Sequence, residues 1–281
     1  MTLRVLVTGG GGQLGSELVR VFDAPHYEVV APTRAQCDLD RRDSVLQAVV
    51  TAEPDVVVHA GAWTAVDACE DDPDRALRVN ALGTRHVQEA ARIVGARLCY
   101  VSTDYVFDGT ASQPYDEWAE PHPLSVYGRS KRGGEVEVDP GGLIVRCSWL
   151  CGYRGANFVK TMLRLAGERD EIGVVADQHG CPTFADDLAG AIHQLVVARM
   201  SGTFHITNQG ATTWHDLARA TLELAGSGPD RIRPLTTAQY PTRAARPAYS
   251  VLDNAALRLA GLPLLAHWTD SLERLVKELI A

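Results

Sequence analysis

Tyr127 and Lys131 are the two residues whose types and spacing most directly suggest chemistry. They stand four positions apart, a spacing that places both side chains on one face if the segment is helical. A free phenol titrates near pH ~10, and an ammonium group nearby favours the phenolate and lowers the phenol pKa. The pair could therefore exchange a proton with a substrate oxygen. A solvated surface pair has the same spacing, so the elements around the two residues must decide.

A glycine-rich segment near the N-terminus predicts a nucleotide-binding turn. The β-branched run Arg4–Thr8 is typical of a buried parallel strand, and it leads directly into glycines at positions 9, 12 and 15. Glycines between a strand and a helix permit a tight turn and the close approach of a pyrophosphate, to which the helix N-terminus offers N–H groups. A plain glycine-rich turn is the alternative. The strand before it and the amphipathic segment after it favour a dinucleotide site at Gly9, Gly12 and Gly15.

The residues after the second predicted strand, Glu28–Ala31, bear on the choice of cofactor. A site selective for NAD usually has an acidic residue here for the ribose 2′-hydroxyl. This chain has Thr33 and Arg34 instead. The Arg34 guanidinium could bind a 2′-phosphate, although it could also be a solvated loop charge. We therefore expect NADPH as the cofactor and leave NADH open.

The third predicted strand, Asp55–His59, leads into the run Ala60–Thr64, where small residues such as Ala60 let the backbone pass close to a cofactor. His59 resembles a catalytic group, but at a strand end we expect a packed histidine. The acidic run Asp67–Asp72 is predicted to be a solvated loop or a helix start rather than a metal site.

Two further strands, Leu98–Ser102 and Leu143–Arg146, complete the pattern. Thr103 follows the first of them, at the sheet edge where open α/β sheets bind ligands, so its hydroxyl could donate to a substrate carbonyl oxygen. Five strand–helix alternations in order predict an α/β fold with a doubly wound parallel Rossmann sheet.

The C-terminal part of the chain is predicted to form a smaller substrate domain. Apolar periodicity indicates three helices and two strands, near residues 157–165, 185–199, 214–225, 173–176 and 202–207. The run 234–247 is predicted to be irregular and could close over a ligand. We place an NAD(P)-binding Rossmann domain at residues 1–156 and a substrate-binding region at 157–281, partly interleaved with the first domain.

Charge and composition exclude several classes of function. The 281 residues carry a formal net charge of −8 with a pI of about 5.6, which argues against a nucleic-acid partner. The six cysteines form no C-x-x-C pair and several lie in apolar runs, so we expect buried thiols in a reducing compartment. We recognise no signal peptide and no long apolar span, and we expect a cytoplasmic protein without a membrane partner.

Four motifs together resemble a known superfamily. They are Thr-Gly-x-x-Gly-x-x-Gly at 8–15, Ser-Thr-Asp-Tyr-Val-Phe at 102–107, Tyr-x-x-x-Lys at 127–131 and Arg-x-Ser-Trp at 146–149. This set resembles the extended short-chain dehydrogenases/reductases and, within them, the dTDP-4-dehydrorhamnose reductase family. Two later segments, 177–183 and 246–253, resemble the same family, so the likeness covers nearly the whole chain.

The resemblance implies roles for individual residues. The catalytic group would be Thr103, Tyr127 and Lys131. The cofactor would be lined by Gly12, Gln13, Leu14, Asp38, Leu39, Ala62, Trp63, Thr64, Tyr127 and Lys131. The sugar nucleotide would be contacted by Thr103, Asp104, Tyr105 and Trp149. Arg246 is a further candidate for its diphosphate, because a planar guanidinium fork suits phosphate oxygens.

The implied reaction is NADPH-dependent reduction of the C4 ketone of a dTDP-4-keto-6-deoxyhexose, with dTDP-4-dehydro-L-rhamnose as the expected substrate and dTDP-L-rhamnose as the product. A reductase giving another dTDP-deoxysugar, an epimerase or dehydratase that retains NAD, and a non-catalytic regulatory subunit are the alternatives. Thr33, Arg34 and the later motifs argue against the epimerase and dehydratase, and the intact catalytic group argues against the regulatory subunit. The sugar, the base, the stereochemistry at C4 and the oligomeric state stay open, with a homodimer as one option.

A few positions depart from the family pattern. Trp63 stands where a smaller or polar residue is expected, and Cys151 and Gly152 replace a more usual tyrosine. These differences bear on the fit of the substrate rather than on the class of reaction. The resemblance implies that Mg²⁺ could bind at a subunit contact, where Glu17 matches one position of the family; a single carboxylate is weak support for a metal, so Mg²⁺ stays an open option.

Overall fold

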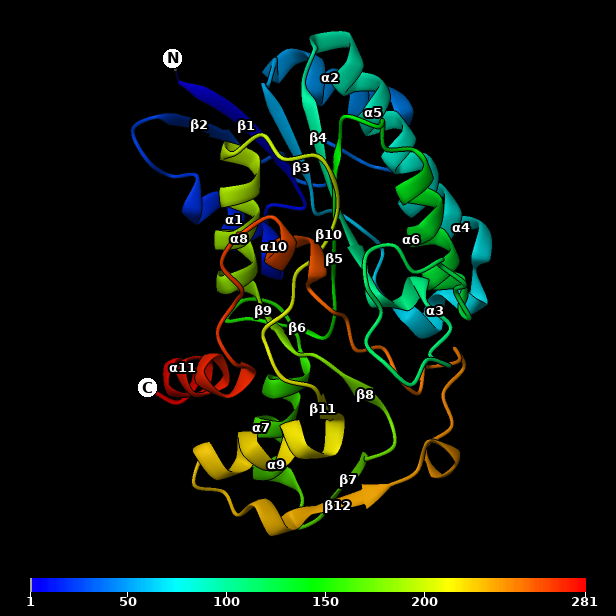
Figure 1. The fold of residues 1–281 in the computed structure, drawn as a ribbon, viewed down its shortest axis with the longest axis vertical. Coiled ribbons are helices and arrows are strands. Elements are labelled where there is room, and N and C mark those ends of the chain that lie inside the picture. The colour runs from blue at the N-terminus through cyan, green and yellow to red at the C-terminus, as the bar shows by residue number, and fades with distance from the viewer. Residues whose placement is uncertain (1) are drawn as a thin grey trace.

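A six-stranded parallel sheet forms the centre of the computed structural model, which describes residues 2–281 (Figure 1). Its strands run in the order β10-β5-β4-β3-β1-β2, and every neighbouring pair is parallel. The strands are β1 (Leu3–Thr8), β2 (Tyr27–Val30), β3 (Val56–His59), β4 (Arg97–Thr103), β5 (Leu143–Cys147) and β10 (Gly202–His205). Five of them coincide with the predicted strands of the first domain, and β10 is contributed by the C-terminal part of the chain.

Helices cover both faces of this sheet. On one face α1 (Gln13–Val21) packs against α8 (Ala185–Val197), and on the other α2 (Arg42–Ala52) packs against α5 (Gly83–Val94). The catalytic-motif helix α6 (Val126–Val136) lies on the second face, beside α5 (Figure 1). Two separate apolar cores result, which is why the strands are continuous apolar runs rather than alternating ones. The predicted doubly wound Rossmann fold is confirmed.

The remaining elements form a smaller unit below the sheet (Figure 1). Three two-stranded pairs and two helices build it: β6 (Leu150–Cys151) with β9 (Thr183–Phe184), β7 (Ile172–Val175) with β12 (Ile232–Leu235), β8 (His179–Gly180) with β11 (Thr212–Thr213), α7 (Phe158–Glu168) and α9 (Trp214–Leu224). Because α8 and β10 belong to the sheet layers, the chain returns to the first unit after residue 157. The exact division at residue 156 stays a prediction.

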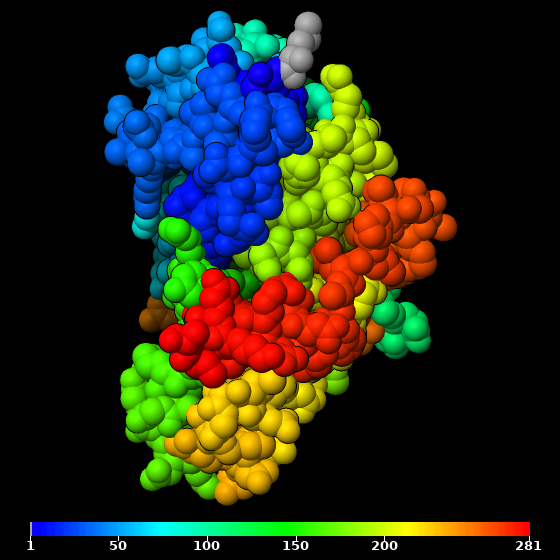
Figure 2. Space-filling view, turned by 90° about the vertical axis from the view of Figure 1, so that its left-hand side faces the viewer, coloured from blue at the N-terminus to red at the C-terminus, as the bar shows by residue number. Residues whose placement is uncertain are grey.

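Several elements were not predicted from the sequence. The C-terminal helix α11 (Trp268–Ile280) lies across the junction between the N-terminal residues and the smaller unit (Figure 2). Also not predicted are α10 (Ala255–Leu259), the short strands β6, β8, β9, β11 and β12, and the short helical turns η2 (Asp104–Val106), η3 (Pro229–Arg231) and η4 (Thr237–Gln239). The run 234–247 was predicted to be irregular, but its first two residues belong to β12, which pairs with β7, and it contains η4. The acidic run starts helices, as expected: α3 (Val66–Asp71) and α4 (Pro73–Leu77) precede a π-turn, η1 (Arg78–Leu82), that leads into α5.

Burial of the thiols follows the sequence prediction. All six cysteines are free and buried. Between residues 2 and 281 we find no helix that combines the length and the apolar character needed to span a bilayer.

Candidate functional site

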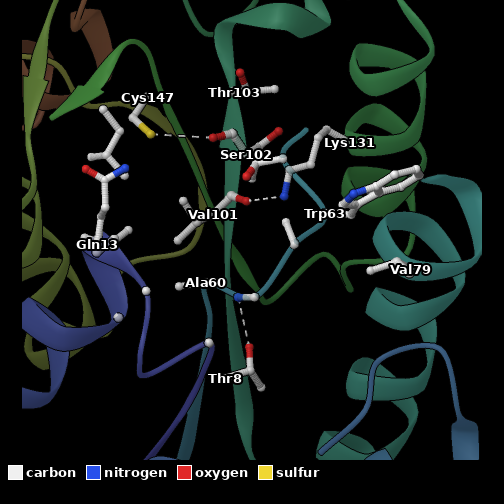
Figure 3. A pocket seen from close by; sticks show the side chains of 18 of the residues that line it. Thr8, Gln13, Ala60, Trp63, Val79, Val101, Ser102, Thr103, Lys131 and Cys147 are labelled. Carbon is white, nitrogen blue, oxygen red and sulfur yellow. Dashed lines mark hydrogen bonds between the residues drawn. The ribbon is translucent and has the colours of Figure 1, made fainter. Parts of the chain in front are cut away.

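One large cleft opens at the carboxyl ends of the central strands, with a volume of about 870 Å³. It is lined by the turns that follow β1, β3, β4 and β5, and by residues of the smaller unit (Figure 3). In the sheet, β2 lies on one side of β1, and β3 and the strands after it lie on the other side. The cleft therefore sits at β1, where the strand order reverses. Open α/β sheets bind their ligands at this point.

The glycine turn after β1 forms a cradle at one end of the cleft. Gly9 has a φ of +70°, and a Cβ there would lie 2.8 Å from the Cα of Gly61, so the two turns touch. A Cβ on Gly15 would overlap the Gly9 carbonyl oxygen, whereas one on Gly11 would meet no atom within 4 Å. Gly12 precedes helix α1 as its N-cap residue, and no side chain caps the helix N-terminus. This turn therefore fits an anionic pyrophosphate.

Gln13 ties the cradle to the smaller unit. Its amide nitrogen donates to the carbonyl oxygen of Ala156 at 3.1 Å, and its amide oxygen accepts from Asn157 at 3.0 Å. Asn157 also caps helix α7, accepting from the backbone N–H of Lys160. The first residue of α1 is thus fixed to the first turn of α7 across the cleft.

Helix α6 brings Tyr127 and Lys131 into the cleft wall. Ser125 caps the helix, accepting from the backbone N–H of Gly128 at 3.1 Å. The Tyr127 ring is buried and packs edge-on against Tyr105, with ring centroids 5.6 Å apart. The Lys131 ammonium donates to the carbonyl oxygen of Val101 at 2.7 Å and lies 4.2 Å from the centre of the Tyr100 ring (Figure 3).

The pKa values at this end of the cleft correct one expectation. Burial raises the pKa of Tyr127 above its ordinary value, and the neighbouring Thr103 hydroxyl only partly offsets this. Burial also lowers the pKa of Lys131 to about 8. The predicted lowering of the phenol pKa by Lys131 is therefore wrong for the protein in this state, because both groups are out of water and the ammonium is bonded to a carbonyl oxygen.

Thr103 and Asp104 place two polar side chains in the cleft wall that also contains Tyr127. The Thr103 hydroxyl donates to Asp104 Oδ1 at 2.9 Å and accepts from the backbone N–H of Tyr105 at 3.2 Å. Asp104 is fully buried, its Oδ2 has no hydrogen-bond partner, and burial raises its pKa to about 6. An unpaired buried oxygen in a cleft wall is suited to a hydroxyl-bearing ligand.

An aromatic wall closes the far side of the cleft. Trp149 stacks on Trp214, with ring centroids 3.6 Å apart and planes within 11°, and Phe158 lies 4.7 Å from Trp214. Trp149 has a φ of +49°, and Gly180 leaves room for its ring, since a Cβ there would lie 2.5 Å from it. Trp149 is predicted by the family resemblance, whereas Trp214 and Phe158 are not predicted, because their positions along the chain give no signal that the three rings share one wall.

The remaining predicted residues can be placed directly. The wall contains all predicted cofactor residues: Gly9, Gly12, Gln13, Leu14, Gly15, Arg34, Asp38, Leu39, Ala60, Ala62, Trp63, Thr64, Tyr127 and Lys131. It also contains Thr103, Asp104, Tyr105 and Trp149. Arg246 is not among the lining residues: its guanidinium bonds Asp67 Oδ2 at 2.7 Å and lies 6.0 Å from the Tyr105 ring centre. His59 is buried and bonded to Thr8 at 2.6 Å, as expected of a packed histidine.

Glu17, the position considered for a metal, bonds the Arg20 guanidinium at 2.7 Å. The part of the chain from residue 2 to 281 holds no group of three His, Cys, Asp or Glu side chains placed to bind a metal ion.

Comparison with known proteins extends over the whole chain. Residues 3–281 match a family model described as the RmlD substrate binding domain. A dTDP-4-dehydrorhamnose reductase of Streptomyces griseus is 45% identical over 278 residues, which cover 96% of this chain and 91% of that protein. A dTDP-4-keto-6-deoxy-D-glucose reductase of Streptomyces niveus is 43% identical over 276 residues, covering 97% and 96%.

A solved structure is similar in both sequence and shape. The dTDP-4-dehydrorhamnose reductase of Bacillus anthracis, crystallised in complex with NADP, has a TM-score of 0.95 and 40% identity, covering 99% of this chain and 100% of that one. The likeness therefore includes both the sheet and the smaller unit.

Proposed function

This chain belongs to the dTDP-4-dehydrorhamnose reductase family, and from that premise we propose that it reduces the C4 ketone of a dTDP-4-keto-6-deoxyhexose with NADPH, most directly dTDP-4-dehydro-L-rhamnose to dTDP-L-rhamnose. The observation that carries the proposal is the convergence of Thr103, Tyr127 and Lys131 on one cleft whose other end is the glycine cradle. We assign residues 1–156 to an NAD(P)-binding domain and residues 157–281 to a sugar-nucleotide-binding region that is partly interleaved with it, since β10 joins the central sheet and Thr103, Asp104 and Trp149 would also face the sugar.

The cleft walls suggest how the cofactor is held. The cradle of Gly9, Gly12 and Gly15 would hold its diphosphate, and Arg34 would meet the 2′-phosphate of NADPH. Arg34 lines the cleft, and its side chain makes no hydrogen bond or ion pair with another of residues 2–281. When bound, the dihydronicotinamide supplies the hydride. Lys131, whose ammonium now bonds a carbonyl oxygen, would hold the ribose hydroxyls.

The chain's own residues would handle the proton at the sugar oxygen. We assign Tyr127 Oη as the proton donor to the oxygen on C4, and Thr103 Oγ1 as a donor to the same oxygen. A phenol whose pKa is raised by burial stays protonated at neutral pH, which suits an acid in the reducing direction. The unpaired Asp104 Oδ2 would bind a sugar hydroxyl, and the half-buried aromatic wall of Trp149 would shield the sugar from water.

A substitution that removes one hydroxyl group tests this assignment. Tyr127→Phe should lower kcat for NADPH oxidation with dTDP-4-dehydro-L-rhamnose by roughly 10²–10⁴-fold, the usual contribution of general acid catalysis. Tyr153→Phe removes a phenol on the exposed surface and should leave kcat unchanged. Retention of most of the rate by Tyr127→Phe would exclude the proposed acid.

A second product stays open because one similar protein carries another name. The Streptomyces niveus relative is a dTDP-4-keto-6-deoxy-D-glucose reductase. A screen of dTDP-4-keto-6-deoxy sugars, with the configuration at C4 of each product determined, separates the two reactions. The substrate with the highest kcat/KM identifies the one that this chain catalyses.

A further inference from the structure

We propose that Arg75 is a phosphate-binding residue of the cleft, held in position by stacking on Trp63. The proposal concerns an arginine that the sequence motifs did not indicate. It also gives a physical role to Trp63, the position at which this chain departs from the expected small or polar residue. It deepens, and rests on, the proposed binding of a dinucleotide and a nucleotide sugar.

Arg75 reaches the cleft from helix α4. It lines the cleft together with Val66 and Val79, which flank it along the chain. Its helix is fixed at the start, because Asp72 caps it by accepting from the backbone N–H of Arg75 at 3.0 Å. This cap holds the Arg75 backbone in the first turn of α4, and its half-buried side chain lines the cleft.

Trp63 provides a flat support for that guanidinium. The Arg75 Cζ lies 4.5 Å from the centre of the indole ring, a cation–π distance. Asn80 locks the backbone of Trp63 on both sides, accepting from its N–H at 2.8 Å and donating to its carbonyl oxygen at 3.1 Å. Figure 3 shows the indole among the side chains that line the cleft, on the same side of the view as Lys131 and Val79. A stacked guanidinium loses little freedom when it binds an oxyanion, because its plane is already oriented.

The Arg75 guanidinium has no carboxylate partner in the described structure. Three carboxylates of this region pair with other arginines, Asp67 with Arg246, Asp71 with Arg243 and Asp40 with Arg78, and Asp72 accepts from the Arg75 backbone rather than from its side chain. Across residues 2–281 the Arg75 guanidinium forms no ion pair. By contrast Arg246, which the family resemblance suggested for a diphosphate, is paired with Asp67 and lies outside the cleft wall.

A phosphate is the ligand chemistry that such a group fits. Guanidinium forks bind phosphate oxygens in pairs, and the proposed ligands of this cleft carry a diphosphate on the cofactor, a 2′-phosphate on NADPH and a diphosphate on the sugar nucleotide. All three groups present phosphate oxygens that a guanidinium could bind. Binding measurements with separate ligands distinguish them.

Arg75→Met removes the charge and keeps much of the side-chain length. Its matched control is Arg78→Met, which removes a cation one turn further on that bonds Asp40 and is not among the lining residues. Dissociation constants of NADPH and NADH would be measured by nicotinamide fluorescence, and that of dTDP by calorimetry, with thermal unfolding to confirm that each variant is folded. Arg75→Lys retains a charge without the planar stack, and it serves as a second variant if the methionine variant does not fold.

We expect Arg75→Met to raise the dissociation constant of at least one ligand roughly tenfold, the loss typical of one charge-assisted hydrogen bond. The dissociation constant of Arg75→Lys should lie between those of wild type and Arg75→Met, and that of Arg78→Met should stay within about twofold of wild type. If only the binding of NADPH weakens, Arg75 contacts the 2′-phosphate. If the binding of both dinucleotides weakens, it contacts the diphosphate of the cofactor, and if the binding of dTDP weakens, it contacts the diphosphate of the substrate. Unchanged binding of all three ligands overturns the proposal. No turnover is required, so an absence of reductase activity would refute the proposed reaction and leave this result standing.

Discussion

Replacing Arg146 by methionine should destabilise the protein by about 3 kcal/mol, because it leaves a buried carboxylate without its main partner. Arg146 Nε and Nη2 donate to the two oxygens of Glu135 at 2.8 and 2.9 Å. The side chain of Glu135 is 0% exposed and that of Arg146 is 4% exposed. Glu135 stands one turn beyond Lys131 on helix α6, so the pair fastens the catalytic-motif helix to strand β5.

The size of the loss follows from what remains at Glu135. Breaking a buried ion pair by removing one partner costs about 3–5 kcal/mol. Arg132 still reaches Glu135 Oε2 at 3.0 Å, but its side chain is 38% exposed, so it compensates only in part and places the loss at the low end of that range. With about 2–4 °C for each kcal/mol in a domain of this size, Tm should fall by roughly 6–12 °C.

Urea and thermal unfolding of matched variants provide the assay. Arg92→Met removes an exposed pair with Asp139, in which the arginine side chain is 60% exposed, and should cost less than about 1 kcal/mol. Glu135→Leu/Arg146→Met removes both buried charges and should be more stable than Arg146→Met alone. A loss in Arg146→Met no larger than in the Arg92 control, or a double variant as unstable as the single one, would refute the reasoning.

The pH dependence of the same pair has a definite sign. Burial alone would raise the pKa of Glu135, but the hydrogen bonds and charge of Arg146 more than offset this, so the pKa lies below its ordinary value. The stability that the pair provides is therefore present above the ordinary carboxyl pKa, and it is lost as pH falls through the lowered one. The difference between wild type and Arg146→Met should narrow in that acidic range.

Two further predictions concern titrating groups in the cleft. Because burial lowers the pKa of Lys131 to about 8, kcat/KM should fall as pH rises through 8 and the ammonium is lost; a pH–rate profile that stays flat across this range would contradict the assigned role. Burial raises the pKa of Asp104 from 3.8 to about 6, so the folded state loses stability as pH rises between these values. Asp104→Asn should then be more stable than wild type at neutral pH by up to about 3 kcal/mol, while its KM for the nucleotide sugar rises. Chemical unfolding measures the stability and steady-state kinetics measure the KM. An Asp104→Asn variant less stable than wild type would contradict the conclusion that the buried carboxylate lowers the stability of the folded state.

Local sequence pattern was enough to predict the sheet and the glycine turn at one end of the cleft. The strand β3 is three consecutive valines before His59, which only a sheet covered on both faces would bury. Gly9 and Gly15 sit where a turn and a close contact leave no room for a side chain. Such constraints act on neighbouring residues, so spacing along the chain reveals them.

Helix α11 shows where periodicity was informative but overlooked. Leu272, Leu275 and Val276 recur at helical spacing and are all buried. The short strand pairs are different, since β6 and β9 have two residues each and exist only because segments over thirty residues apart meet.

Local sequence pattern predicts the parallel fold, the glycine cradle and the helical spacing that puts Tyr127 and Lys131 together, because backbone conformation and side-chain periodicity are local properties. The chemistry around these residues depends on the tertiary structure. Whether an arginine lines the cleft, as Arg75 does, or pairs with an aspartate, as Arg246 does, depends on which distant segments fold against it. The same holds for a phenol pKa, which burial raised where spacing alone had predicted a decrease.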